Sequence, residues 1–186
     1  MGTADLHQAV EDISDLPGSV TTVQDYGELL SAFHRAHTVI EGALGAEDLV
    51  PTWLELGHDM ADHRQLGALC DDLAALGVDP DPRAAEVLQL GSPSEALGCL
   101  YVVEGSSLGR RVLAPLLKER LGEVPTAFFD GRDGHPHAWR QVQSSIKRAT
   151  GDPLQPLAIL TGARATFEVF LDALGDRAAR RHLSCA

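Results

Sequence analysis

The sequence lacks the features of several protein classes. No apolar run among its 186 residues approaches the roughly 20 residues of a membrane-spanning helix. The first 30 residues also lack a basic start followed by an apolar stretch, so a cytoplasmic protein without a membrane partner is expected. Aromatic residues make up only 5% of the chain, and no run of β-branched and aromatic residues alternates with polar ones. Strands are therefore not expected.

Positive charge is scarce in the first part of the chain. The net charge is −12, and residues 1–105 contain 3 Lys or Arg against 19 Asp or Glu, whereas residues 106–186 contain 12 against 8. The excess of negative charge argues against nucleic acid and acidic membranes as partners. Two explanations of the asymmetry stay open: an uneven solvated surface, or a basic rim that receives an anionic ligand. Cysteine is rare as well, and the three cysteines form no CxxC pair, so reduced thiols are expected.

Apolar residues recur at intervals of three and four, which predicts a single all-α domain over residues 1–186. Pro115 lies inside the longest predicted helix and is expected to bend it. Residues 123–137 are expected to be irregular. The predicted helices cover residues 3–16, 21–45, 48–76, a short stretch after Pro82, 92–122, 137–149 and 156–174, followed by a basic helical tail.

The stretch "LYVVEGSSLGRRVL", residues 100–113, places two glycines inside a long helix. Each costs about 1 kcal/mol relative to alanine there. Because each helical residue advances by 100°, Gly98, Gly105 and Gly109 fall on one stripe, with Ser106 at its edge. Two explanations fit such a stripe. Another helix crosses it closely, or a flat ligand approaches the bare backbone.

Among the eight histidines, His7 is a candidate metal ligand. Thr3, His7 and Glu11 are spaced by four residues and share one face of the first predicted helix. The positive end of the helix dipole favours a neutral imidazole, which is the form that binds a metal.

Other histidines give competing metal sites. His34, His37 and Glu41 share part of a helix face, so His34 or His37 is the alternative ligand. Glu55 and His58 form a single Glu-x-x-His, whereas a di-iron carboxylate bundle needs two such pairs and two more glutamates. A di-iron enzyme with Glu55 and His58 as ligands is therefore a weaker alternative.

Several segments together resemble the bacterial heme oxygenases, in particular the kind associated with bacteriophytochromes. The most specific segment is "ALGCLYVVEGSSLG" at residues 96–109, which is similar to the distal helix of that family. The resemblance spans residues 3 to about 174. It also rests on "TADLHQAVE" at 3–11, "YGELL" at 26–30, "RQLGALCDDLAALG" at 64–77, Trp139, and "GARATFEVF" at 162–170.

The resemblance implies a heme oxygenase-like helical bundle with a bent distal helix and a role for each motif residue. His7 would be the proximal iron ligand. Gly105 and Gly109 would lie against the other face of the heme, and Ser106 with ordered water would deliver protons.

Basic residues would hold the heme propionates. Arg140 and Lys147 are the first candidates, with Arg110 and Arg111 as alternatives. The chain departs from the family here, because the distal motif commonly continues as Gly-Gly-Gln, whereas Gly109 is followed by two arginines.

The implied reaction uses heme b as both cofactor and substrate, together with dioxygen, and yields biliverdin, carbon monoxide and ferrous iron. The sequence has no GxGxxG after a strand pattern, so an external electron donor such as a ferredoxin or a reductase is expected. A photoreceptor that accepts the bilin is a further implied partner. Two alternatives remain: a non-catalytic heme- or bilin-binding protein on the same fold, and a structural protein whose glycine stripe only packs helices.

Overall fold

The computed structural model describes residues 3–81, 87–131, 135–149 and 155–184. Within these ranges the regular structure is helical and contains no strand, which confirms the predicted all-α fold. None of the described helices combines the length and apolarity that crossing a bilayer requires. The helices are α1 (Thr3–Ser14), α2 (Val23–Leu44), α3 (Val50–Leu56), α4 (Leu66–Leu76), α5 (Pro93–Leu121), α6 (Ala127–Asp130), α7 (His135–Ala149) and α8 (Gln155–Ser184), with short 3₁₀ helices η1 (Glu47–Leu49) and η2 (Met60–His63).

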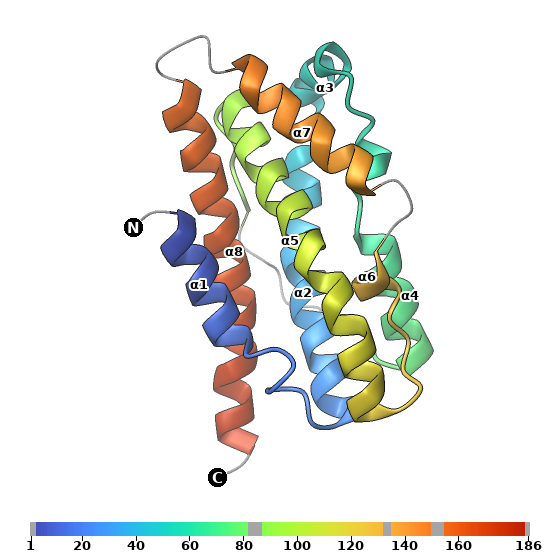
Figure 1. The fold of residues 1–186 in the computed structure, drawn as a ribbon. Helices are drawn as coiled ribbons and strands as arrows, with labels where there is room; N and C mark the ends of the chain where they lie inside the picture. The colour runs from blue at the N-terminus through green and yellow to red at the C-terminus, as the bar shows by residue number, and fades with distance from the viewer. Residues whose placement is uncertain (1–2, 82–86, 132–134, 150–154, 185–186) are drawn as a thin grey trace.

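The two longest helices, α5 and α8, pack against each other along the bundle (Figure 1). At their crossing the backbones leave no room for side chains. A Cβ atom on Gly98 of α5 would lie 1.9 Å from the carbonyl oxygen of Ile159, and one on Gly162 of α8 would lie 1.9 Å from that of Glu95. Glycine on both helices therefore permits this close crossing.

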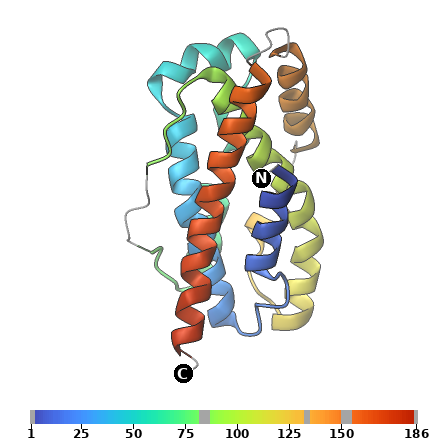
Figure 2. The same ribbon diagram turned by 90° about the vertical axis from the view of Figure 1, so that its left-hand side faces the viewer.

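Helix α8 forms a common support for α1 and α5. In Figure 1, α1 lies in front of α8 and α5 lies to its right, and Figure 2 shows α1 and α8 side by side with α5 behind them. Both helices pack on α8, while α7 packs on α5. This arrangement matters because the predicted proximal histidine lies on α1 and the distal glycines lie on α5.

The start of α2 follows directly from its sequence. The Thr22 side chain accepts a hydrogen bond from the Asp25 backbone N–H, and the Asp25 carboxylate accepts one from the Thr22 N–H, which is a capping box. The helix ends before Gly45. The predicted helix over residues 21–45 is confirmed to within two residues.

The helix predicted over residues 48–76 is wrong, because that segment is divided into η1, α3, η2 and α4. Gly57 ends α3 in a left-handed conformation, with φ of 76°. In one continuous helix His58 and His63 would point about 140° apart. The break after Gly57 allows both imidazoles to turn into the core, where they are 4% and 1% exposed.

Other boundaries differ from the prediction in smaller ways. Residues 155–184 form one helix, and Gly175 lies inside it, where a Cβ would be 3.4 Å from Ile13 of α1. The segment predicted as irregular contains α6 and the first turn of α7. Helix α5 continues through Pro115, and the bend expected there stays a prediction. The helix predicted after Pro82 begins at residues 82–86, which lie outside the described ranges, and residues 87–91 are not helical.

Candidate functional site

Apolar side chains are exposed along one face of α5. Tyr101, Leu108, Val112 and Leu116 are 41%, 51%, 66% and 38% exposed. Their spacing of seven, four and four residues places them on one side of the helix, the same side as the two glycines in its middle. The remainder of α5 contributes many residues to the core. An apolar stripe of this kind is typical of a ligand- or partner-binding surface.

The three glycines of the predicted stripe have different surroundings. Gly98 is in backbone contact with α8, so the packing explanation is correct for that residue. A Cβ on Gly105 would meet the Trp139 ring of α7 at 3.6 Å, which is an ordinary contact distance, and one on Gly109 would meet nothing within 4 Å. Close helix packing therefore does not explain glycine at these last two positions.

His7 lies on α1 with 57% of its side chain exposed. Its ring packs edge-on against Phe167 of α8, at 6.1 Å between ring centroids and an interplanar angle of 84°. Its Nδ1 atom lies 3.6 Å from Oε1 of Glu11. A carboxylate near Nδ1 favours the tautomer that leaves Nε2 available to a metal.

Basic and aromatic side chains lie together on α7. Arg140 and Lys147 are exposed and, seven residues apart, share one face of that helix. Trp139, next to Arg140, packs on Tyr101 of α5 at 5.0 Å between ring centroids and lies over Gly105. Helix α7 therefore borders the apolar stripe of α5.

Arg110 and Arg111, the two other predicted propionate contacts, do not lie on the glycine face of α5. Arg110 is only 7% exposed, and its guanidinium lies 4.0 Å from the centroid of the Phe128 ring and donates a hydrogen bond to Ser107. The Arg111 side chain lies along the end of α6, where its Nε would be 3.3 Å from a Cβ on Gly131. Both arginines point away from the glycine face, because they follow Gly109 by about 100° and 200° of helix rotation. We therefore correct the prediction for the buried Arg110, whereas the contact of the exposed Arg111 stays a prediction.

Ser106 lies at the edge of the stripe, as its helical position indicates. It is partly buried, and its hydroxyl donates to the Val103 carbonyl oxygen at 2.9 Å. The hydroxyl oxygen keeps lone pairs that can accept a hydrogen bond from water.

His37 and Glu41 have structural roles that make them poor metal ligands. His37 is 1% exposed, and its ring centroid lies 5.6 Å from those of both Phe128 and Phe170. Burial lowers its pKa. The Glu41 carboxylate accepts hydrogen bonds from the backbone N–H groups of Gln65 and Leu66, at 2.6 and 2.9 Å, and thereby anchors the start of α4.

The di-iron alternative finds no support in the structure. Glu55 is exposed, whereas His58 is buried and bound to His63 and Ser145, so the Glu-x-x-His residues do not converge. No group of three or more His, Cys, Asp or Glu among the described residues is arranged to hold a metal ion.

A buried chain of polar side chains lies beside the distal glycines, and the sequence alone did not predict it. Glu104, directly before Gly105, is fully buried and binds His63, which binds His58. The available signal was the single carboxylate in the apolar run "LYVVEG", since a buried charge requires partners. Its partners are distant in sequence, so no spacing rule identifies them.

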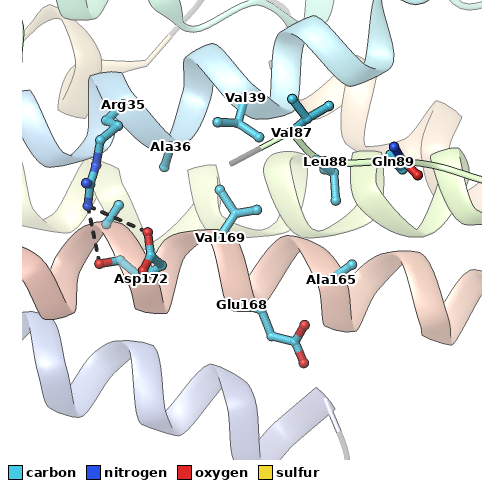
Figure 3. Close-up of a pocket in the computed structure, with 11 residues that line it drawn as sticks. Arg35, Ala36, Val39, Val87, Leu88, Gln89, Ala165, Glu168, Val169 and Asp172 are labelled. Atoms are coloured by element: carbon cyan, nitrogen blue, oxygen red, sulfur yellow. Dashed lines mark hydrogen bonds and ion pairs between the residues drawn. The ribbon is translucent and has the colours of Figure 1, made fainter. Parts of the chain in front are cut away.

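A pocket of about 420 Å³ lies elsewhere in the molecule, between α2, α8 and residues 87–89 (Figure 3). Its walls are polar and apolar in about equal measure. At one end Arg35 forms an ion pair with Asp176 at 2.6 Å and approaches the Asp172 carboxylate at 3.8 Å. None of the predicted site residues lines this pocket.

Known proteins are similar to this chain in both sequence and fold, although no family model matches the sequence. Over 157 residues the chain is 31% identical to a protein named heme oxygenase from Xanthomonas campestris pv. campestris (strain 8004), covering 82% of this chain and 90% of that protein. The fold of this chain is similar to that of the NO- and CO-bound heme oxygenase from Neisseria meningitidis, with a TM-score of 0.73 and 21% sequence identity. That match covers 95% of this chain and 88% of the solved one, and it confirms the predicted type of helical bundle.

Proposed function

This chain belongs to the heme oxygenase family, and from that premise we propose that it cleaves heme, using dioxygen and reducing equivalents, to biliverdin, carbon monoxide and ferrous iron. The observation that carries the proposal is the pairing of an exposed imidazole on α1 with an open, apolar, glycine-bearing face on α5. Both helices are supported by α8.

The residues present fit a heme. A porphyrin is a flat apolar disc, and the exposed stripe of Tyr101, Leu108 and Val112 offers it an apolar surface. A Cβ atom added at Gly109 would meet nothing within 4 Å, so a macrocycle can approach the backbone there. On α1, His7 supplies the nitrogen ligand that heme iron commonly takes from proteins.

Heme b supplies the iron at which dioxygen is activated, and its own ring is the substrate that is opened. The chain provides binding and orientation. Glu11 and Phe167 contact the His7 ring, and the carboxylate near Nδ1 would leave Nε2 available to the iron. Gly109 leaves open space for the distal face of the heme, where a larger side chain would obstruct it, and Gly105 would border that space beside the Trp139 ring.

The borders of the site set where the ring is attacked. We assign the propionate contacts to Arg140 and Lys147, because both are exposed cations on the helix that borders the stripe. Loss of either contact would change how the macrocycle is oriented and therefore which meso carbon is attacked. Ser106 lies where it can bind water that supplies protons.

The proposal includes partners outside the chain. Electrons come from an external donor, a ferredoxin or a reductase, and the bilin product is passed to an acceptor such as a photoreceptor. A reduced donor is available in the cytoplasm, which we propose as the place of the reaction. We treat residues 1–186 as one domain in this function.

The experiment is to add hemin to the purified protein and follow its absorption spectrum, before and after adding a reductant in air. We expect a Soret band of a histidine-bound heme and then the spectrum of biliverdin, with carbon monoxide released. A stable Soret band without bilin would instead identify a non-catalytic heme-binding protein. No Soret band at all would contradict the proposal.

A further inference from the structure

Four buried side chains connect α5 to α7 through the segment that follows Gly57. Oε1 of Glu104 lies 2.9 Å from Nδ1 of His63, and Nε2 of His63 lies 3.1 Å from Nδ1 of His58. Nε2 of His58 lies 3.0 Å from Oγ of Ser145 on α7. The four residues are between 0% and 4% exposed. They therefore join the two helices inside the protein, and we call these four side chains the α5–α7 bridge.

A second set of hydrogen bonds holds α7 on the backbone beside the same segment. The Gln141 side-chain amide donates to the Gly57 carbonyl oxygen. Nη2 of Arg148 donates to the Leu56 carbonyl oxygen at 3.4 Å and to the Ser145 hydroxyl at 3.0 Å. Gln141, Ser145 and Arg148 are spaced by four and three residues, so they lie on one face of α7. Because hydrogen bonds are directional, bonds along one face fix the rotation of α7 about its axis.

Away from this bonded face, α7 carries the residues that border the glycine face of α5. Arg140 and Lys147 are exposed there. Arg140 and Ser145 are five residues apart, which places them about 140° apart around the helix. The Trp139 ring lies 3.6 Å from the position of a Cβ atom on Gly105. A rotation of α7 would therefore move the two exposed cations and the Trp139 ring together relative to α5.

The α5–α7 bridge is polar, although apolar packing would also hold α7 against α5. Apolar contacts are non-directional, so an apolar helix face can turn on its neighbour with little change in buried area. A buried hydrogen bond that breaks leaves an unpaired polar group, which is costly in the protein interior. A rotation of α7 would break several of these bonds at once. The bridge therefore favours one placement of α7.

We propose that the α5–α7 bridge, together with the Gln141 bond beside it, positions α7 and thereby selects which meso carbon of heme is attacked. These residues act through Arg140, Lys147 and Trp139, because they fix the helix that carries all three. The bridge reaches α5 at the residue directly before Gly105. The inference rests on the proposed function, in which cations on α7 hold the propionates and so orient the macrocycle.

The placement of α7 is tested without heme, by fluorine NMR of protein labelled with fluorotryptophan. The chain has two tryptophans, Trp53 and Trp139, and a Trp139→Phe protein assigns their signals. Ser145→Ala removes one link of the bridge, and Gln141→Ala removes the neighbouring bond to the backbone. Each variant should shift the Trp139 signal, because α7 is no longer held in one rotation.

The effect on the reaction is tested in the hemin-loaded protein, by chromatography of the bilin product. Ser145→Ala and Gln141→Ala should each change the ratio of the major isomer to the others at least about threefold, which is the effect of losing the net contribution of one hydrogen bond. A merely structural role would lower the free energy of unfolding in urea and leave the isomer ratio unchanged. Ser144→Ala is the matched control, because that exposed hydroxyl donates to the Arg140 carbonyl oxygen of its own helix. It should change neither the Trp139 signal nor the isomer ratio.

The two proposals fail in different ways. Wild-type protein that forms bilin, with both variants giving the same isomer ratio or leaving the Trp139 signal in place, would overturn the positioning role alone. Wild-type protein that forms no bilin would overturn the proposed function and the positioning role with it. If Ser145→Ala does not fold, Gln141→Ala decides, because the Gln141 side chain is only partly buried.

Discussion

Replacing Gly109 by alanine separates the functional and the structural explanation of the glycine stripe. A Cβ at Gly109 meets nothing within 4 Å, so the methyl group causes no clash in the protein without heme. Alanine favours a helix interior by about 1 kcal/mol over glycine. For a chain of this length that corresponds to a melting temperature about 2–4 °C higher. Gly109→Ala should therefore stabilise the protein.

The same methyl group should weaken heme binding, because it occupies the space between the macrocycle and the backbone of α5. The assay combines urea denaturation of the heme-free protein with a hemin titration followed at the Soret band. Gly98→Ala is the matched comparison. Its Cβ would lie 1.9 Å from the Ile159 carbonyl oxygen, so it should destabilise the fold by about 3 kcal/mol or prevent folding.

The result that refutes this reasoning is a Gly109→Ala protein that is less stable than the wild type and binds hemin normally. That outcome would mean that Gly109 is in a packed helix contact, as Gly98 is, and that the open face of α5 does not receive the ligand.

Three further predictions follow from the other site residues. His7→Ala should abolish the spectrum of histidine-bound heme, and added imidazole should restore it. Because the His7 side chain is exposed, the free energy of unfolding should change by less than about 0.5 kcal/mol. An unchanged spectrum would mean that another residue binds the iron. Burial holds the pKa of His58 at about 4, below its value of 6.5 in the unfolded chain. The contribution of His58 to the free energy of unfolding, measured by urea denaturation, should therefore be constant above pH 6.5 and fall by a few kcal/mol between pH 6.5 and 4. A free energy of unfolding that does not change over this range would contradict the buried neutral imidazole. Arg110→Ala should destabilise the protein by about 2 kcal/mol without changing the biliverdin isomer. Arg140→Ala and Lys147→Ala should instead change the isomer with little effect on stability. Chromatography of the bilin product identifies the isomer, and the reverse pattern would restore Arg110 as a propionate contact.

The helical content and the glycine stripe could be predicted because both depend on local periodicity. The stripe of Gly98, Gly105 and Gly109 is present on α5, but periodicity could not distinguish its members. Gly98 meets the backbone of Ile159 and Ala163 on α8, and that contact depends on how two distant helices cross. Side-chain size along one helix contains no information on that crossing.

The buried polar chain shows a second limit. His58 and His63 are five residues apart, which in a helix gives no shared face, and only the turn after Gly57 brings them together. Arg110 shows a third limit. A charged residue after the distal motif suggested a ligand contact, yet its guanidinium is buried over Phe128 because that side of α5 faces the core.

The most direct test of where heme binds is a crystal structure of the hemin complex. We predict that His7 Nε2 binds the iron and that the other porphyrin face lies against the α5 backbone at Gly105 and Gly109. A macrocycle found in the pocket between α2 and α8, or bound through another histidine, would contradict this account.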